Sequence, residues 1–511
     1  MQKTNRLLYL LAAIKFLLPL LLQDGFYQPH RDEYLYLSEG QHPAWGYLEV
    51  PPLLSVFAWL TNHLGGSAFW IKLWPNLTGV CTLLLTGKII QSLGGRLFAV
   101  LLGCLPLMLC GYLRLFYLLH PNFLDVFFWT LQFFSLIRYV QSRENKWLYL
   151  FGAAAGLGMM SKYSSAFCIL SLLAGLLITR ERRIFLNKHF YGAALLALII
   201  FLPNLLWQYN HRFPIVNHME ELHDEQLKYN SPVAFIISQL MLNLQFVFVW
   251  MAGLLFALFS QPGKAYRFAG WAYLFIILIL IIFQGKDYYA SGAYPFLFAF
   301  GGFYLEQLTT RLIWVRYVIT SLGVAACLLA MPLILPVIKP EQLATYYKKI
   351  GLGNSGVLRW EDQQVHPLPQ DFADMIGWKE MAEKAARVYH SLPPGQQQKT
   401  LIFCRAYYTA GALNYYGPAY GLPTVYSDNA SFLFWMPGHY NINNLLLIGH
   451  NLPGHDEPVF QQFEKFSVKD SVAMPLFREN GMRFILFEHA NASLNPLLER
   501  EVAGLKAKFR R

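Results

Sequence analysis

The chain has 511 residues, of which 55% are hydrophobic and only 14% are charged. A soluble domain usually has about 25% charged residues, so this composition excludes an ordinary water-soluble protein and indicates that a bilayer solvates much of the chain. The formal net charge of +11 raises nucleic acid as a partner. Basic and acidic residues nearly balance after residue 341, however, and the excess lies in short clusters between apolar segments. That distribution is typical of cytoplasmic loops of membrane proteins, so we expect membrane lipids and no nucleic acid as partners.

The first apolar segment, residues 7–22, follows Lys3 and Arg6. A signal peptide has this arrangement, but no small-residue cleavage site follows the segment, so we interpret it as an uncleaved anchor. The six cysteines include no CxxC pair, and neither a disulfide framework nor a cysteine zinc site is predicted.

Long apolar runs predict membrane-spanning helices, because a helix satisfies its own backbone hydrogen bonds in lipid. About eleven spans are expected, at residues 7–22, 68–92, 97–113, 123–140, 148–160, 164–179, 190–207, 233–259, 268–284, 290–307 and 313–338. The basic clusters all fall at one end of these spans, which we assign to the cytoplasm together with the N-terminus. Most acidic residues before position 341 then lie on the outer side.

We divide the chain into a transmembrane domain, residues 1–340, with a first outer loop at 23–67, and an outer C-terminal domain, residues 341–511. In the C-terminal domain, strands are predicted at 400–404, 424–426, 444–448 and 483–487, and helices near 407–415 and 499–511. Short apolar runs alternating with helical patterns indicate a small α/β domain.

The first outer loop carries acidic and aromatic residues that suggest chemistry. Asp32 and Glu33 begin an amphipathic stretch. An acidic pair at a helix start can simply cap the helix, but a carboxylate near the membrane surface can also take the proton of an attacking hydroxyl or amine. Trp45 and Tyr47 are typical of a loop that rests on the membrane interface and stacks on sugar.

Two further charged groups are expected on the outer side. Asp125 lies at the outer end of the fourth span, where a carboxylate is costly and usually functional; the alternative is a buried Asp paired with Arg114. Lys286 follows the ninth span beside Tyr288 and Tyr289. It can hold a lipid phosphate as a point charge, or it can simply snorkel beside aromatic anchors.

Glu49 in the first outer loop and His218 after the seventh span form a candidate divalent-metal pair, because carboxylate and imidazole both suit zinc or manganese. A lone histidine is equally often an ordinary surface or core residue, so that alternative stays open. The sequence has neither a P-loop nor a Rossmann glycine fingerprint. No nucleotide cofactor is therefore predicted, and a lipid-linked sugar donor is favoured over a nucleotide sugar.

Five motifs follow one another: Arg-Asp-Glu-Tyr at 31–34, Trp-Gly-Tyr-x-Glu-x-Pro-Pro at 45–52, His-Pro-x-x-x-Asp at 120–125, Ser-Lys-Tyr at 161–163 and Gly-Lys-x-Tyr-Tyr at 285–289. Together they resemble the dolichyl-phosphate-mannose:protein mannosyltransferase-like superfamily, of the family 39/83 type. Within it, the pattern is most similar to the bacterial aminoarabinose:lipid A transferases. The resemblance implies the GT-C fold: a polytopic α-helical membrane protein with about 11 to 13 transmembrane helices and a C-terminal extracytoplasmic α/β domain.

The resemblance also implies roles for particular residues. Asp32 corresponds to the acidic residue of the first outer loop that the family uses in catalysis, with Glu33 as its partner. Asp125 corresponds to the aspartate at the outer end of the fourth span. Lys162 and Lys286 resemble basic residues near the phosphate of the lipid carrier.

Glu49 and His218 resemble a pair that binds a divalent metal such as zinc, manganese or magnesium. Val50 stands where the aminoarabinose enzymes have a lysine, so the donor sugar stays open. We therefore predict a glycosyltransferase of the bacterial inner membrane that moves a sugar from a polyprenyl-phosphate donor to a lipid, glycan or protein acceptor, with inversion at the anomeric carbon.

Two other classes compete with this prediction. A transporter or flippase of lipid-linked sugars would need broken helices in corresponding halves and charges at the membrane midplane. A non-catalytic scaffold would not require Asp32, Glu49 and His218 together.

Overall fold

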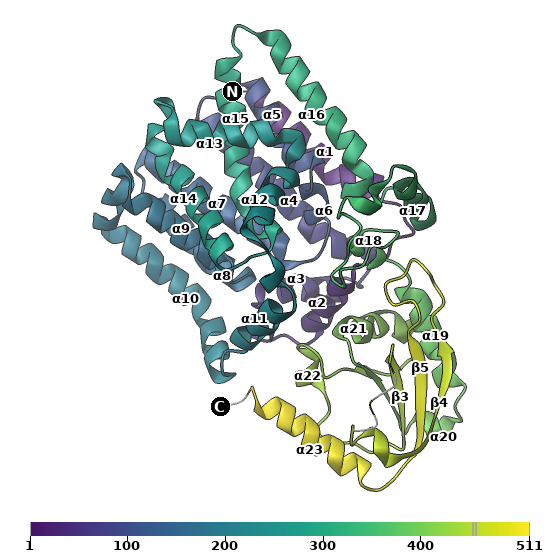
Figure 1. Ribbon diagram of the computed structural model, residues 1–511. Helices are drawn as coiled ribbons and strands as arrows, with labels where there is room; N and C mark the ends of the chain where they lie inside the picture. The colour runs from purple at the N-terminus through teal and green to yellow at the C-terminus, as the bar shows by residue number, and fades with distance from the viewer. Residues whose placement is uncertain (1, 452–453, 455–456, 510–511) are drawn as a thin grey trace.

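The computed structural model describes residues 2–451, 454 and 457–509 of the chain. Figure 1 shows a large helical bundle joined to a smaller domain that contains a β-sheet. The bundle consists of α1 (Gln2–Leu22), α4 (Ala68–Ser92), α5 (Leu97–Leu109), α7 (Pro121–Ser142), α8 (Lys146–Ser161), α9 (Ser165–Leu177), α10 (Lys188–Asn210), α12 (Pro232–Leu242), α13 (Val247–Phe259), α14 (Arg267–Ile282), α15 (Tyr294–Leu308) and α16 (Ile313–Ile334).

Each predicted span overlaps one or two of these helices. Within the described part of the chain, six helices are long and apolar enough to cross a membrane, and the bent pair α12 and α13 makes a seventh if it is one span. The expectation of one continuous helix over 233–259 is wrong, since this pair is bent by 66°. Asn243 leaves the helical conformation at the break, with φ −130°.

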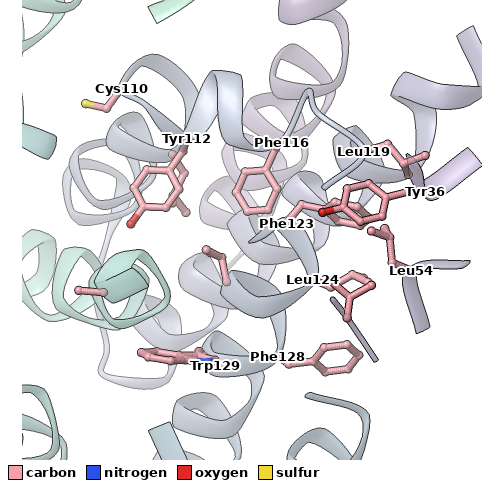
Figure 2. Close-up of a cluster of buried hydrophobic side chains, with 14 of the residues drawn as sticks. Tyr36, Leu54, Cys110, Tyr112, Phe116, Leu119, Phe123, Leu124, Phe128 and Trp129 are labelled. Atoms are coloured by element: carbon pink, nitrogen blue, oxygen red, sulfur yellow. The ribbon is translucent and has the colours of Figure 1, made fainter. Parts of the chain in front are cut away.

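Helix α7 forms the centre of the bundle, since 72% of its apolar window is buried, compared with 17% for α10 and 22% for α16. Figure 2 shows Phe123 of α7 beside Phe116, with Phe128 and Trp129 further along the helix, and all four are buried. Helices α10 and α16 instead turn apolar side chains outward, which is stable where lipid replaces water.

Glycines allow two central helices to touch through their backbones. A Cβ atom on Gly301 of α15 would lie 1.8 Å from the carbonyl oxygen of Val249, and one on Gly253 of α13 would lie 2.0 Å from that of Leu297. Small residues of this kind permit close helix approach in membranes.

Shorter helices lie on the side of the bundle that faces the C-terminal domain (Figure 1). They are α2 (Arg31–Gln41), α3 (Leu53–His63), α6 (Tyr112–Leu115), α11 (Pro214–Glu225) and α17 (Pro340–Lys349). The C-terminal domain contains α18 (Gln370–Ala373), α19 (Trp378–His390), α20 (Pro394–Gln397), β1 (Thr400–Cys404), α21 (Tyr407–Tyr416), β2 (Val425–Tyr426), α22 (Phe432–Trp435), β3 (Asn444–Gly449), β4 (Phe463–Ser471), β5 (Arg483–Ala490) and α23 (Leu494–Ala507).

The sheet of the C-terminal domain has the strand order β2-β1-β3-β5-β4. Strand β1 is parallel to β2 and β3, whereas β5 is antiparallel to β3 and β4. The predicted strands correspond to β1, β2, β3 and β5, and the predicted helix at 407–415 corresponds to α21. The sheet therefore confirms the expected α/β character of this domain.

Two elements of the C-terminal domain were not predicted, and the bounds of one predicted helix need correction. Strand β4 was not predicted, because it is an edge strand with charged, mostly exposed residues, a composition that discourages pairing with other chains. Helix α19 was also not predicted. The helix expected at 499–511 begins earlier, at Leu494, and residues 510–511 lie outside the described residues.

The two domains meet along α2 and α21. Tyr34 of α2 is fully buried, and its ring packs against Trp378, Tyr415 and Tyr416 of the C-terminal domain, with centroid separations of 5.7, 5.6 and 6.0 Å. A Cβ atom on Gly411 would lie only 2.9 Å from Tyr34. We call this contact region the domain seam.

The close contact of α13 and α15 gives a stability prediction. Gly301→Ala should destabilise the protein by about 1–3 kcal/mol, because the added methyl group meets backbone that cannot move aside easily. Thermal unfolding of the purified protein in detergent measures the change. Gly111→Ala is the control, since nothing lies within 4 Å of its Cβ position; equal melting temperatures for the two variants would contradict the packing argument.

Candidate active site

Asp32 lies in the first turn of α2, at the domain seam. His30 caps this helix: its Nδ1 accepts a hydrogen bond from the Asp32 backbone N–H at 3.2 Å, and Glu33 accepts one from the His30 N–H at 2.7 Å. Such a reciprocal capping box satisfies donors that a helix start leaves unpaired. The capping role weighed for the acidic pair therefore applies to Glu33, while the Asp32 carboxylate is left for other partners.

Glu33 anchors α2 inside the bundle. Lys72 of α4 donates to both of its oxygens, at 2.8 and 2.6 Å, and the backbone N–H of Leu119 donates to Oε1 at 2.7 Å. With the His30 N–H, each carboxylate oxygen accepts two hydrogen bonds. No acceptor capacity remains for a substrate proton, so we assign Glu33 a positioning role.

A tyrosine hydroxyl, a guanidinium and two imidazoles surround the Asp32 carboxylate. The Tyr407 hydroxyl donates to Oδ1 at 2.7 Å, and Arg31 Nε lies 3.4 Å from the same oxygen. His120 Nε2 lies 3.6 Å from Oδ2. His30 Nδ1 is 3.9 Å from Oδ2, but it already accepts the Asp32 N–H and so carries no proton to donate. Oδ2 is therefore the less engaged oxygen.

The charge state of this group follows from its neighbours. Burial would raise the pKa of Asp32, but Arg31, His120 and His30 outweigh it and hold that pKa well below the usual range. Burial lowers the pKa of His120, against the opposing effect of Asp32. Near neutral pH the site thus holds an ionised carboxylate beside a neutral imidazole.

A second layer of charges ties this carboxylate to the C-terminal domain. Asp374 is fully buried, and its Oδ2 lies 3.3 Å from Arg31 Nε and 3.5 Å from His30 Nε2. Arg478 reaches the other oxygen at 3.3 Å, and Glu361 pairs with Arg31 at 3.1 Å. Burial raises the pKa of Asp374 to about 6 despite these cations. Alternating charges therefore continue across the domain seam.

Asp125 lies on α7 with one oxygen unengaged. Ser164 donates to its Oδ2 at 2.8 Å, while Oδ1 is buried without a hydrogen-bond partner among the described residues. The alternative that Arg114 neutralises it is wrong, because Arg114 pairs with Asp371 at 3.2 Å. Lys162 interacts electrostatically with Asp125.

The two predicted phosphate-binding lysines lie near one another. Lys162 and Lys286 interact electrostatically. The charge of Lys162 also helps to lower the pKa of His120. The Lys162 ammonium donates to Asn122 at 2.7 Å and lies 4.2 Å from the ring centroid of Tyr289.

Tyr288 completes this side of the site. Its ring centroid is 5.6 Å from the Lys162 ammonium, and its hydroxyl interacts electrostatically with Asp32. The structure thus brings together, at one end of the bundle, the predicted residues Asp32, Asp125, Lys162, Lys286, Tyr288 and Tyr289.

Glu49 lies beside His218 but is bonded to the C-terminal domain. The backbone N–H and the hydroxyl of Ser431 donate to its two oxygens, both at 2.7 Å. Burial raises the pKa of Glu49, while Ser431 and His218 act in the opposite direction. Tyr36 interacts electrostatically with both Asp32 and Glu49, so this pair borders the same site.

The pair of Glu49 and His218 does not by itself fit a complete metal site. A catalytic zinc usually has three protein ligands. Over residues 2–451, 454 and 457–509, no group of three or more His, Cys, Asp or Glu side chains is placed to hold a metal ion. The divalent metal stays a prediction, and no chemical step is assigned to it.

The two aromatic residues of the first outer loop differ in accessibility. Trp45 is 60% exposed, so its ring is available to a ligand. Tyr47 is 2% exposed, and its hydroxyl shares its one proton between the backbone carbonyls of Glu39 and His42, at 3.0 and 3.1 Å. The expectation that Tyr47 stacks on sugar needs correction, because its ring is enclosed and instead holds the loop in place.

Sequence reasoning missed four residues around the Asp32 carboxylate. Arg31 and His120 belong to the quoted motifs and could have been found by asking which neighbours would hold a base. Asp374 and Tyr407 carried no signal, since Tyr407 is 375 positions away from Asp32.

Comparison with known proteins identifies the architecture. The profile of the family described as dolichyl-phosphate-mannose-protein mannosyltransferase matches residues 49–207. ArnT from Cupriavidus metallidurans, bound to undecaprenyl phosphate, superposes with a TM-score of 0.63 at 14% identity, over 96% of this chain and 98% of that chain. The chain has the GT-C glycosyltransferase fold.

A second match is the archaeal oligosaccharyltransferase AglB from Archaeoglobus fulgidus, in complex with an inhibitory peptide and a dolichol-phosphate. It superposes with a TM-score of 0.50 at 11% identity, over 87% of this chain and 69% of that chain. A search of curated proteins found no match. Because the ArnT match extends over almost the whole of both chains, the GT-C likeness includes the C-terminal domain.

The buried ion pair that orients Asp32 can be tested separately from catalysis. Lys72→Met should destabilise the protein by about 3–5 kcal/mol, because it leaves the Glu33 carboxylate buried without its counter-charge. Adding Glu33→Gln should restore part of the loss, since glutamine is neutral and still completes the capping box. Thermal unfolding of the single and double variants decides the matter; wild-type stability for Lys72→Met would rule out the anchoring role.

Proposed function

We propose that this chain is a glycosyltransferase that moves a sugar from a polyprenyl-phosphate donor to a lipid, glycan or protein acceptor. The observation that carries the proposal is the Asp32 carboxylate, held ionised at the end of the bundle with Oδ2 facing a neutral His120. A positioned carboxylate with one open oxygen is suited to take a proton from an attacking group.

The basic residues support a phosphate-linked donor. Lys162 and Lys286 lie together near His120 and Asp125, and an ammonium group holds phosphate as a point charge. The similar ArnT structure is described as bound to undecaprenyl phosphate, and the AglB structure as bound to a dolichol-phosphate. A lipid carrier would reach this end of the bundle sideways from the membrane.

The proposed reaction is one displacement. The acceptor oxygen or nitrogen attacks the anomeric carbon and forms the new bond, while the bond from that carbon to the phosphate oxygen breaks and its electron pair stays on polyprenyl phosphate. The acceptor proton passes to Oδ2 of Asp32, and the anomeric centre is inverted. Lys162 and Lys286 stabilise the charge that develops on the leaving phosphate.

The low basicity of Asp32 fits this order of events. A carboxylate with a strongly lowered pKa is a weak base and does not deprotonate a free hydroxyl. An oxygen that has begun to bond to an oxocarbenium-like carbon is far more acidic. Asp32 therefore accepts the proton late, after attack has started.

The proposed setting is the bacterial inner membrane. The basic loops would face the cytoplasm by the positive-inside rule, and Asp32 with the C-terminal domain would then face the periplasm. Mass spectrometry of envelope glycolipids and glycoproteins from a strain lacking the gene would identify the missing sugar and its acceptor, and hence the substrates for the assays below.

The base assignment predicts the effect of Asp32→Asn. The amide keeps the shape of the side chain but accepts no proton, so transfer by the purified protein should fall by about 10²–10⁴-fold. Asp362→Asn is the matched control, because that carboxylate is exposed in the C-terminal domain. Wild-type turnover by Asp32→Asn would disprove the assignment.

The phosphate assignment predicts the effect of Lys286→Ala. Loss of a charge-assisted contact should lower kcat/KM for the lipid donor by about 10- to 100-fold, and the remaining activity should depend less on salt. Lys228→Ala serves as the control, since Lys228 is exposed. The assignment fails if both variants keep the kcat/KM of the wild type.

A further inference from the structure

We infer that the C-terminal domain completes the active site through Tyr407, a positioning residue whose hydroxyl fixes the orientation of the Asp32 carboxylate. The inference rests on the proposed function, because it concerns the group assigned there as the base. It goes beyond that proposal by giving the C-terminal domain a part in the chemical step.

The first ground is the asymmetry of the two carboxylate oxygens. Tyr407 donates to Oδ1 at 2.7 Å, and Arg31 Nε lies 3.4 Å from that oxygen, whereas His120 Nε2 lies 3.6 Å from Oδ2. A carboxylate can rotate about its Cβ–Cγ bond, and the hydrogen bond from Tyr407 restrains that rotation, while the Arg31 guanidinium attracts the same oxygen only as a charge. Tyr407 therefore holds Oδ1 and leaves Oδ2 facing His120.

The second ground is the place of Tyr407 in the fold. It is the first residue of α21, directly after the loop that follows β1. Strand β1 has parallel neighbours on both sides, β2 and β3. In α/β sheets, functional residues usually lie at the carboxyl end of a strand that has one parallel neighbour on each side, because the connections diverge there. In this protein, that edge of the sheet faces the helical bundle, and Tyr407 bonds to Asp32 there.

The third ground is that the Tyr407 bond is not needed to hold the domains together. Tyr34 packs against Trp378, Tyr415 and Tyr416 across the domain seam, and Ser431 binds Glu49. A second phenol on the same helix, Tyr415, donates to the backbone carbonyl of Gly66 at 2.7 Å. Loss of one of these bonds leaves the others in place, so an effect on chemistry can be separated from an effect on docking.

The groups that face Asp32 from all sides define what the hydroxyl adds. They are Arg31 and His30 beside it, Tyr36 on α2, His120 before α7, Tyr288, Asp371 and Asp374 of the C-terminal domain, and Tyr407. Tyr407 is the one group in this set whose hydroxyl lies within 3 Å of the carboxylate. Arg31 and the two histidines hold the pKa of Asp32 low, and the directed hydrogen bond from Tyr407 fixes the orientation of the carboxylate.

The test is Tyr407→Phe, assayed for transfer from the lipid-linked donor by the purified full-length protein. We expect kcat to fall by about 10- to 100-fold, the effect of losing one hydrogen bond to a charged group, with an unchanged KM for the donor. Tyr415→Phe removes an equivalent hydrogen bond from the same helix and should retain wild-type kcat and KM. Melting temperatures and hydrogen exchange at the domain seam establish that both variants stay folded and docked.

A double-variant cycle distinguishes positioning from a structural role. If Tyr407 acts through Asp32, then Tyr407→Phe should change the residual rate of Asp32→Asn by less than about twofold, because the two residues work as a unit. The inference is overturned if Tyr407→Phe has wild-type kcat, or if the two losses multiply. An inactive wild-type protein would instead refute the proposed function, so the two failures are distinguishable.

Discussion

The buried pair of Glu33 and Lys72 is the interaction on which the candidate site depends. It fixes α2 against α4 with a charge-to-charge contact of 2.6 Å in a fully buried setting. Neighbouring residues on a helix point about 100° apart, so holding Glu33 in the bundle turns Asp32 toward the domain seam. A buried pair of this kind adds little net stability but is costly to break, and it therefore defines one position for α2.

From that starting point the charges alternate outward. Asp32 forms an ion pair with Arg31. Arg31 also pairs with Asp374 and Glu361, and both of these carboxylates pair with Arg478. Asp374 and Glu361 are thus each held between Arg31 and Arg478, and electrostatic interactions are strong for a buried group such as Asp374. The catalytic candidate is consequently not an isolated acidic residue at a membrane surface. It is the inner end of a network that continues into the C-terminal domain.

The membrane spans and several candidate site residues were predictable from the sequence. The partners of those residues were not. Apolar run length located the spans, because burying an unpaired backbone in lipid is prohibitive, and short motifs picked out Asp32, Asp125 and Lys286. Glu33 looked identical to Asp32 in the sequence, yet its acceptor sites are filled by Lys72 and Leu119. No local pattern distinguishes a carboxylate that caps and anchors from one that is left open, since the difference lies in partners from distant elements.

The same limit explains why the role of the C-terminal domain was not foreseen. Composition alone describes it as a small soluble α/β domain, and such domains often act independently of the membrane part to which they are attached. Its first parallel strand leads into Tyr407, and α22 begins beside Ser431, which binds Glu49. Of the three acidic residues singled out in the first outer loop, Asp32 and Glu49 therefore have a partner in this domain. A change that moved the domain by even one hydrogen-bond length would disturb Asp32 and Glu49 together, so the candidate site depends on the C-terminal domain as well as on the membrane bundle.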